Sequence, residues 1–452
     1  MASSKRGSPG DWPLVKAVEL SGFKSVFSPT TVDLAPITLL AGANSSGKSS
    51  FMQALVLLKQ TLEAQIDPGP LKLGGPNVHF SFADQFLSRI SKGKEASAFK
   101  LGFTFDHPGS VQLTIGRGKE MPIEVREFVV EDEDSKVTLR PGMTSKEIEA
   151  QLPDGYKAQT PHGFKANEIE YYVEPSRFLL NYQARLKGGP DRLLAGGGRH
   201  LFTLRLMNFL SRFIHLPGLR GHPLRRYPLA AVGKAFPGLF GPEYTASIIS
   251  AWQDAKGEDG KQKLTEVGTD LHDLGLTWKV AAKRVSDAEA ELLVGRLQSS
   301  VRGGAHDLVN IADVGFGVSQ VLPVVVALHI AEAEQTVYLE QPEIHLHPAA
   351  QVVLARVLAR AIARGVRVIV ETHSSSLLLA LQTLVAEGAE LNPDDVRLYW
   401  FTRDPKTGET QVSPASLDQE GAFGNWPVDF GKVELQLESR YLDALDARHG
   451  AK

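Results

Sequence analysis

The sequence contains no cysteine and no long apolar run. Without cysteine, the 452 residues can form no disulfide bond, thiolate nucleophile or cysteine-ligated zinc site. The longest mainly apolar stretch, Val321–Ala333, is interrupted by Pro323 and His329, and it is shorter than the roughly 18 residues that a membrane span needs. The polar leader Met1–Trp12 lacks the apolar core of a secretion signal. We therefore expect a cytoplasmic protein without membrane contacts.

The sequence also lacks a strong excess of either charge. Its formal net charge of −3 gives no general attraction to nucleic acid. The segment Asn181–Ala230 differs, because it has nine Lys and Arg residues against one acid, Asp191. These cations could contact nucleic-acid phosphates, or they could pair with acids of the protein itself. For Arg220, Arg225 and Arg226, which lie close to prolines, we favour the structural role.

A glycine-containing loop follows a short apolar run near the N-terminus. Ile37–Ala41 predicts a buried strand, Gly42–Ser49 has the spacing G-x-x-x-x-G-K-S, and the apolar spacing that follows predicts a helix to about Glu63. In this setting the loop N–H groups and the helix N-terminus bind phosphate. We expect ATP to bind here, with Lys48 at the β- and γ-phosphates and Ser49 completing a Mg²⁺ shell.

The residues before position 300 predict a mixture of strands, helices and loops. The strands are expected at Val15–Leu20, Thr30–Leu34, Ala98–Phe105, Ser110–Ile115, Ile123–Glu131 and Lys136–Leu139, with a hairpin from Thr277–Val285 and Glu291–Arg296. Helices are expected at Lys146–Leu152 and Leu201–Ile214 and across Ala230–Leu276, and loops at Pro190–Gly198 and Pro217–Pro228.

The residues from Asp313 onward alternate between strands and helices, which indicates a parallel sheet covered by helices. The expected strands are Thr336–Leu339, Val366–Val370 and Val396–Phe401, and the expected helices are Val318–Glu332, Pro348–Ala363, Ser374–Glu387 and Lys432–Arg448.

Four short motifs lie in this second half. They are Asp313–Gln320 (DVGFGVSQ), Thr336–Glu343 (TVYLEQPE), Ile344–Pro348 (IHLHP) and Val368–Ser374 (VIVETHS). Taken alone, each has a simpler interpretation: His345 and His347 could be a metal pair, Glu340 a surface acid, and His373 a buried core histidine. Their order, with carboxylates at the ends of apolar strands, favours a ligand site at the carboxyl edge of the sheet.

Together these motifs resemble the head domain of ABC-type ATPases of the SMC, RecF and OLD branch. They are most similar to bacterial AAA-type ATPases that carry GANSSGKS, GFGVSQVLP, EQPEIHLHP and ETHS. His215–Tyr227 resembles the central Pro/Arg motif of that group, and GAFGNWPVDF resembles an element of its small C-terminal domain of unknown function. About half of the chain lies between these motifs.

The resemblance implies roles for individual residues. The Walker A loop would hold ATP through Gly42, Asn44, Ser45, Ser46, Gly47, Lys48, Ser49 and Ser50, and the signature loop would contribute Gly315, Gly317, Ser319 and Gln320. Glu340 would be the Walker B acid and, with Ser49, a Mg²⁺ residue, and Gln85 is the candidate for the metal-contacting glutamine between the lobes. His345 and His347 would lie in the loop that crosses a dimer, and His373 would sense the γ-phosphate.

One position departs from the pattern of ABC-type heads. The residue after the Walker B acid is normally a glutamate that polarises the attacking water, but here it is Gln341. An amide can orient water but cannot accept a proton at neutral pH. Glu343 or Glu371 could supply the base instead. We therefore expect slow hydrolysis, with Glu340, Gln341, Glu343 and His373 as the catalytic candidates.

The predicted architecture is an α/β ABC-type P-loop ATPase head, divided by a large insertion. We expect an N-terminal half (residues 1–97), an inserted region (98–300), a C-terminal half (301–400) and a small appendage (401–452). The resemblance implies a homodimer or higher even oligomer around ATP, signalling to a protein effector in phage defence. The alternatives are a non-hydrolysing scaffold that holds a toxin or nuclease, and a RecF-like clamp on DNA.

Overall fold

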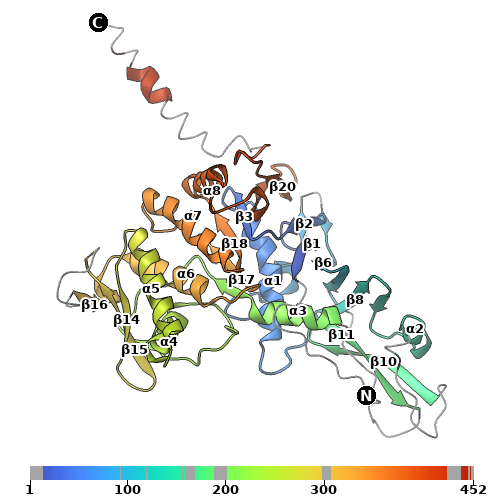
Figure 1. Ribbon diagram of the computed structural model, residues 1–452. Helices are drawn as coiled ribbons and strands as arrows, with labels where there is room; N and C mark the ends of the chain where they lie inside the picture. The colour runs from blue at the N-terminus through green and yellow to red at the C-terminus, as the bar shows by residue number, and fades with distance from the viewer. Residues whose placement is uncertain are drawn as a thin grey trace.

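The structure is a computed structural model (Figure 1) that describes residues 14–91, 93–118, 121–153, 157, 168–187, 201–297, 307–424, 439–445 and 448. The leader Met1–Trp12 and the predicted loop Pro190–Gly198 lie outside the described residues. Of the predicted closing helix Lys432–Arg448, only residues 439–445 and 448 are described, and these are helical.

A six-stranded sheet carries the phosphate-loop strand near its centre. Its order is β12-β17-β18-β3-β19-β20, and all neighbours are parallel except β19 and β20. The strands are β12 (Ile214–Leu216), β17 (Thr336–Glu340), β18 (Arg367–Thr372), β3 (Ile37–Gly42), β19 (Val396–Arg403) and β20 (Thr410–Ser416). Because parallel strands end at one edge, the segments that follow β3, β17 and β18 are brought together there.

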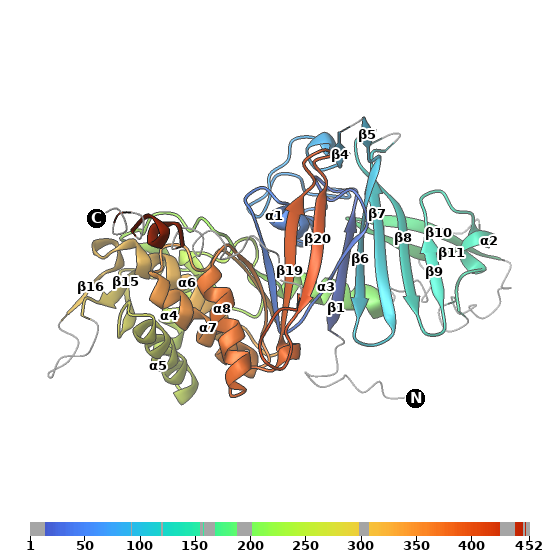
Figure 2. The same ribbon diagram turned by 90° about the horizontal axis from the view of Figure 1, so that it is seen from above.

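The two faces of this sheet are buried against different layers. Alternate residues such as Leu39 and Val370 pack with helices on one face, whereas Leu40 and Ile369 pack on the opposite face. Figure 2 shows this arrangement, with α6, α7 and α8 on one side of β19 and β20 and the antiparallel strands on the other. The helices of the first face are α6 (Phe316–Ile330), α7 (Pro348–Ala363) and α8 (Ser375–Glu387).

A second sheet is antiparallel and shares its core with helix α1 (Lys48–Leu62). Its order is β2-β1-β6-β7-β8-β9, comprising β2 (Thr30–Asp33), β1 (Val15–Ser21), β6 (Ala98–Phe105), β7 (Gly109–Gly116), β8 (Glu124–Asp132) and β9 (Lys136–Leu139). Beside it lie α2 (Ser145–Glu149), the hairpin β10 (Ile169–Ser176) and β11 (Leu179–Leu186), and α3 (Leu201–Arg212). Short elements η1 (Ala83–Gln85), β4 (Arg89–Ile90) and β5 (Lys94–Glu95) connect α1 to β6.

A third unit packs on α6. It contains α4 (Pro242–Asp254), α5 (Glu258–Asp273) and a small sheet of β13 (Tyr227–Pro228), β14 (Val280–Arg284), β15 (Glu289–Gly295) and β16 (Leu308–Asn310). A buried polar cluster joins this unit to the main sheet, because Asp270 accepts hydrogen bonds from both His329 on α6 and Arg360 on α7. Short helices η4 (Ile311–Asp313) and η5 (Pro393–Asp395) precede α6 and β19.

The predicted α/β class is confirmed, but several predicted helices have different bounds. The region Ala230–Leu276 becomes helical only at Pro242, because Gly233, Pro237 and Gly238 precede it and disfavour a helix. The helix predicted at Leu201–Ile214 ends at Arg212, and Ile214 begins β12.

The domain boundaries remain a prediction, although β6 pairs directly with β1 across the proposed boundary at residue 98. Within the described residues, no helix is both long and apolar enough to cross a membrane.

Candidate nucleotide site

The phosphate loop has a backbone that only glycine adopts easily. Gly42 has a φ of 140° and Gly47 a φ of 110°, both in the left-handed region. A Cβ atom on Gly42 would lie 2.1 Å from the Phe401 carbonyl oxygen, and one on Gly47 would lie 2.1 Å from Thr410 Oγ1. The two glycines therefore allow the loop to curl closely against β19 and β20 before α1 begins.

Lys48 and Ser49 lie in the first turn of α1. The Lys48 ammonium donates hydrogen bonds to the carbonyls of Gly42 (3.0 Å) and Ala43 (2.8 Å), so it lies within the curl of the loop. Burial lowers the pKa of Lys48, and nearby Glu371 opposes that shift. Of the other predicted loop residues, Asn44 and Ser45 are exposed, Ser46 is buried and Ser50 is half-buried. The loop thus presents a cation and a hydroxyl at a helix N-terminus, which is a site for an anion.

Two glutamates lie side by side where β17 and β18 end. Glu340 is the register partner of Glu371, and the Tyr338 hydroxyl donates to Glu371 Oε1. Glu371 Oε2 accepts a hydrogen bond from the Ser49 hydroxyl at 2.8 Å. The carboxylate of Glu340 instead lies 2.8 Å from His215 Nε2 and accepts from Gly218 N at 3.1 Å. Only Glu371 therefore contacts the phosphate loop directly.

The surroundings of the two glutamates move their pKa values in opposite directions. Burial raises the pKa of Glu371 to about 7, although the Tyr338 hydrogen bond favours its ionised form. Burial is also the largest influence on Glu340 and opposes its ionisation, but the hydrogen bond and charge of His215, together with hydrogen bonds from Gly218 N and Tyr338, leave its pKa below the usual value. One carboxylate is held as an anion, and the other ionises close to neutral pH.

Gln341 has an unusual backbone conformation directly after β17. Its φ is 44°, in the left-handed region that few non-glycine residues adopt. The turn is held by Gln341 N, which donates to the Glu371 carbonyl at 2.8 Å, and by Arg220, which donates to the Gln341 carbonyl at 3.3 Å. The side chain lines an open cleft of about 750 Å³ that also includes Asn44 and His373.

Glu343 and His373 form a second linked pair beside that cleft. Glu343 Oε1 accepts from Thr372 Oγ1 at 2.7 Å and from His373 N at 3.0 Å, which fixes the start of the segment after β18. The His373 ring is hydrogen-bonded to the Gly42 backbone, while burial and nearby Lys48 lower its pKa. Glu343 thus positions His373, and His373 lies at the phosphate loop.

His345 and His347 belong to the turn between β17 and α7. His345 is exposed, has a φ of 69° and lines the cleft. His347 caps α7, because its Nδ1 accepts from Ala349 N at 3.3 Å. Among the described residues, no group of three or more His, Cys, Asp or Glu side chains could hold a metal ion. Within the part of the chain that the structure describes, His345 and His347 therefore have no third ligand with which to form a metal site.

The predicted signature loop opens α6, but two of its polar side chains turn inward. The Ser319 hydroxyl donates to the Phe316 carbonyl at 2.9 Å, and Gln320 Nε2 donates to the Gly221 carbonyl at 2.8 Å. Gly315 is the N-cap of α6, with an ordinary φ of −61°. The side chain of Phe316 is 47% exposed and packs beside His222 and His345. The loop therefore presents Gly315 and an aromatic ring to its surroundings.

The Pro/Arg connector, residues 217–228, holds the site together, which could not be predicted from the sequence. Buried Arg220 donates to the carbonyls of Gln320 (3.2 Å) and Glu340 (2.9 Å), so it joins the start of α6 to the end of β17. His215, just before the connector, stacks on Tyr338 with ring centres 5.0 Å apart. The signal was the HLPGLRGHPLRRY motif itself, whose partners could not be identified without the fold.

We favoured a structural role for Arg220, Arg225 and Arg226. The hydrogen bonds of Arg220 described above confirm this role for that residue. Arg225 makes two hydrogen bonds to Asp313. Arg226 lies 4.0 Å from Glu289. Elsewhere in the basic segment, Arg185 pairs with Glu170 and Arg212 with Glu332. Asp191, Arg192 and Arg199 lie outside the described residues.

The side chain of Gln85, the candidate for a metal-contacting glutamine, is hydrogen-bonded within its own turn. Its side-chain oxygen accepts from Ser81 N at 2.6 Å and from Phe82 N at 3.4 Å. Its predicted contact with the metal is untested and remains a prediction.

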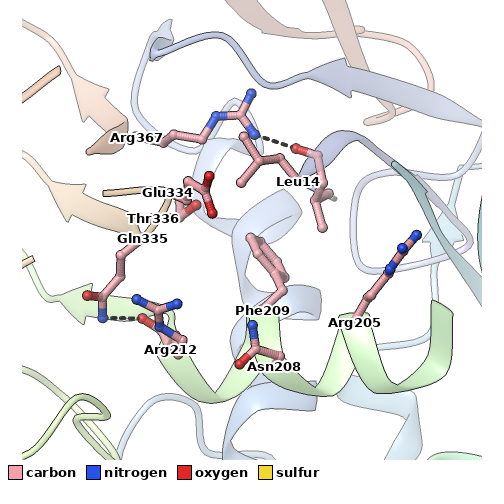
Figure 3. Close-up of a pocket in the computed structure, with 10 residues that line it drawn as sticks. Leu14, Arg205, Asn208, Phe209, Arg212, Glu334, Gln335, Thr336 and Arg367 are labelled. Carbon is pink, nitrogen blue, oxygen red and sulfur yellow. Dashed lines mark hydrogen bonds between the residues drawn. The ribbon is translucent and has the colours of Figure 1, made fainter. Parts of the chain in front are cut away.

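A smaller pocket lies at the opposite end of the strands (Figure 3). Its lining includes Thr336 and Arg367, which begin β17 and β18, together with Arg205 and Arg212 of α3. The Arg367 guanidinium donates to the Val15 carbonyl at 2.6 Å. With a volume of about 40 Å³, this pocket is too small for a nucleotide.

The model of a family described as "AAA domain, putative AbiEii toxin, Type IV TA system" matches residues 37–380. A search of curated proteins gave no match.

Solved structures of low sequence identity are also similar to the chain. An SMC head bound to the C-winged helix domain of ScpA has a TM-score of 0.46 and 10% identity, covering 90% of this chain and 99% of that chain. An SMC head domain from Thermotoga maritima has a TM-score of 0.37 and 12% identity, covering 89% and 98%. An Smc head domain with an extended coiled coil, bound to the C-terminal domain of ScpA derived from Pyrococcus furiosus, has a TM-score of 0.45 and 11% identity, covering 89% and 96%.

Proposed function

The chain belongs to this AAA-domain family, and we propose that it binds ATP with Mg²⁺ at the phosphate loop and hydrolyses it slowly. The observation that supports the proposal most strongly is the position of Lys48 and Ser49. Both lie at the start of α1, behind two glycines with positive φ. The backbone N–H groups of the loop, the helix N-terminus and the Lys48 ammonium are the groups that would hold the phosphates there.

The oxygen groups at this position fit Mg²⁺. The Ser49 hydroxyl and the carboxylate next to it are hard oxygen ligands, and Mg²⁺ usually combines one or two carboxylates with phosphate oxygens and water. When bound, the ion would neutralise phosphate charge. The protein's own residues would hold the phosphates through Lys48 and contact the γ-phosphate end through His373.

Slow hydrolysis is proposed because of the residues beside the cleft. Gln341 occupies the position of the usual catalytic glutamate, and its amide can orient water without accepting the proton. Glu343 uses one oxygen to hold Thr372 and His373, which favours a positioning role over that of a base.

We further propose that ATP brings two copies of the chain together and that a protein effector responds. Exposed Phe316 and the open position of Gly315 in the signature loop support a second copy as the partner. The family description names a toxin–antitoxin system, which supports an effector with a role in defence. Contact with nucleic acid is less favoured, because Arg185, Arg212, Arg225 and Arg226 each have an acidic partner.

The test of nucleotide binding is Lys48→Ala, measured by titration of a fluorescent ATP analogue. We expect affinity to fall at least a hundredfold while the circular dichroism spectrum is unchanged, because the buried ammonium is lost from the loop. Lys100→Ala, on the exposed side of β6, is the matched control and should bind like the wild type. Equal affinity in the Lys48→Ala variant would contradict the proposal.

A further inference from the structure

A buried carboxylate contacts the hydroxyl expected to bind Mg²⁺, and it is not the predicted Walker B acid. The Ser49 hydroxyl donates to Glu371 Oε2 at 2.8 Å. Glu371 is 3% exposed, and its other oxygen accepts from the Tyr338 hydroxyl. Both oxygens thus have fixed partners, and one lies directly beside the phosphate loop.

The order of the strands explains why Glu371 reaches this position. β18 lies between β17 and β3, so Glu371 is one strand away from the phosphate-loop strand and pairs with Leu40. Glu340 pairs with Glu371 from the next strand out. Since neighbouring strands are about 4.8 Å apart, the backbone of Glu340 is about 10 Å from β3.

The side chain of Glu340 is engaged on the other side, toward β12. His215 on that strand lies 2.8 Å from Glu340 Oε1, and Gly218 N donates to Oε2 at 3.1 Å. His215 is itself fixed, because it is buried and stacks on Tyr338. Both oxygens of Glu340 therefore hold the segment that leads into the Pro/Arg connector.

We propose that Glu371 is the carboxylate that organises Mg²⁺ beside Ser49, whereas Glu340 anchors residues 215–218 to the sheet. Glu371 would act as a ligand or through one ion-bound water, as carboxylates do in Mg²⁺–nucleotide sites. Tyr338 holds the other oxygen of the Glu371 carboxylate, and its hydroxyl also interacts with Glu340. This assignment rests on the proposed function, since it concerns the metal that accompanies ATP.

The test compares Glu371→Gln with Glu340→Gln, using the affinity for a fluorescent ATP analogue in Mg²⁺ and in EDTA. The quantity measured is the ratio of the two affinities, which reports the contribution of the metal without requiring hydrolysis. We expect this ratio to be at least tenfold lower for Glu371→Gln than for the wild type, with an unchanged affinity in EDTA. Glu340→Gln, the same substitution one strand away, should keep the ratio.

Retention of the ratio in Glu371→Gln, or its loss in Glu340→Gln, would overturn the assignment. If Glu371→Gln does not fold, Glu371→Asp keeps the charge but withdraws it from Ser49, and it should show the same loss. Failure of the wild type to bind the analogue in both Mg²⁺ and EDTA would contradict the proposed function instead.

Discussion

The phosphate loop and the signature loop are both glycine-containing loops that open a helix, yet they differ in what they present. In the phosphate loop, Gly42 and Gly47 have positive φ and pack against β19 and β20. In the signature loop, Gly315 has an ordinary φ and nothing lies within 4 Å of where its Cβ would be. The first loop is shaped by close packing at both glycines, whereas the second is open at Gly315 and packs against Leu276 at Gly317.

Their polar side chains also differ. Lys48 is buried and donates to carbonyls of its own loop, and exposed Ser49 donates to Glu371. Ser319 and Gln320 are both buried and donate to the carbonyls of Phe316 and Gly221. A helix N-terminus alone therefore does not make a complete phosphate site. In the proposed function the phosphate loop holds the nucleotide, and we infer that the signature loop acts only when a nucleotide held elsewhere is brought to it.

The largest expected difference comes from adding a methyl group to one glycine of each loop, Gly47 in the phosphate loop and Gly315 in the signature loop. Gly47→Ala should lower the free energy of unfolding by about 3 kcal/mol, because the residue is both left-handed and in contact with Thr410. ATP affinity should fall at least tenfold. Gly315→Ala should change the unfolding free energy by at most about 1 kcal/mol, the effect of a weaker helix cap.

Chemical denaturation and nucleotide titration of the two variants provide the measurement. Equal destabilisation by both substitutions would show that the two loops are constrained alike, which would remove the basis of the comparison.

A smaller effect is expected from substitutions at Gln341 and Glu343, which should change turnover without changing nucleotide affinity. Gln341→Glu places a base beside the cleft, so phosphate release should rise about a hundredfold while ATP affinity stays within a factor of three. Glu343→Gln should reduce turnover only slightly, because the amide oxygen can still accept from Thr372 and His373. Loss of all activity in Glu343→Gln, with no gain in Gln341→Glu, would identify Glu343 as the base.

Features that depend on neighbouring residues could be predicted from the sequence. The spacing of Gly42, Gly47 and Lys48 predicted the phosphate loop, and apolar periodicity predicted α7 at Pro348–Ala363 with the bounds observed. Both depend on interactions within a few residues of the chain. The late start of α4 was missed because the apolar pattern was given more weight than the glycines and prolines before Pro242.

The contacts that complete the candidate site could not be predicted in this way. Ser49 and Glu371 are 322 positions apart, and their contact follows from β18 lying between β17 and β3. A sequence motif identifies Glu340 as a strand-end acid but does not give the strand order that turns it toward His215. Likewise, the inward side chains of Ser319 and Gln320 depend on the connector, which is distant in sequence.

The most direct test of the account is a sedimentation velocity experiment with a fluorescent ATP analogue and Mg²⁺, which reports nucleotide binding and particle mass together. Phe316→Asp changes the exposed ring of the signature loop and leaves the phosphate loop intact. We predict that the analogue sediments with a dimer for the wild type, with a monomer for Phe316→Asp, and with no protein for Lys48→Ala. Sedimentation of the analogue with a wild-type monomer, or with an undiminished dimer of Phe316→Asp, would contradict the account.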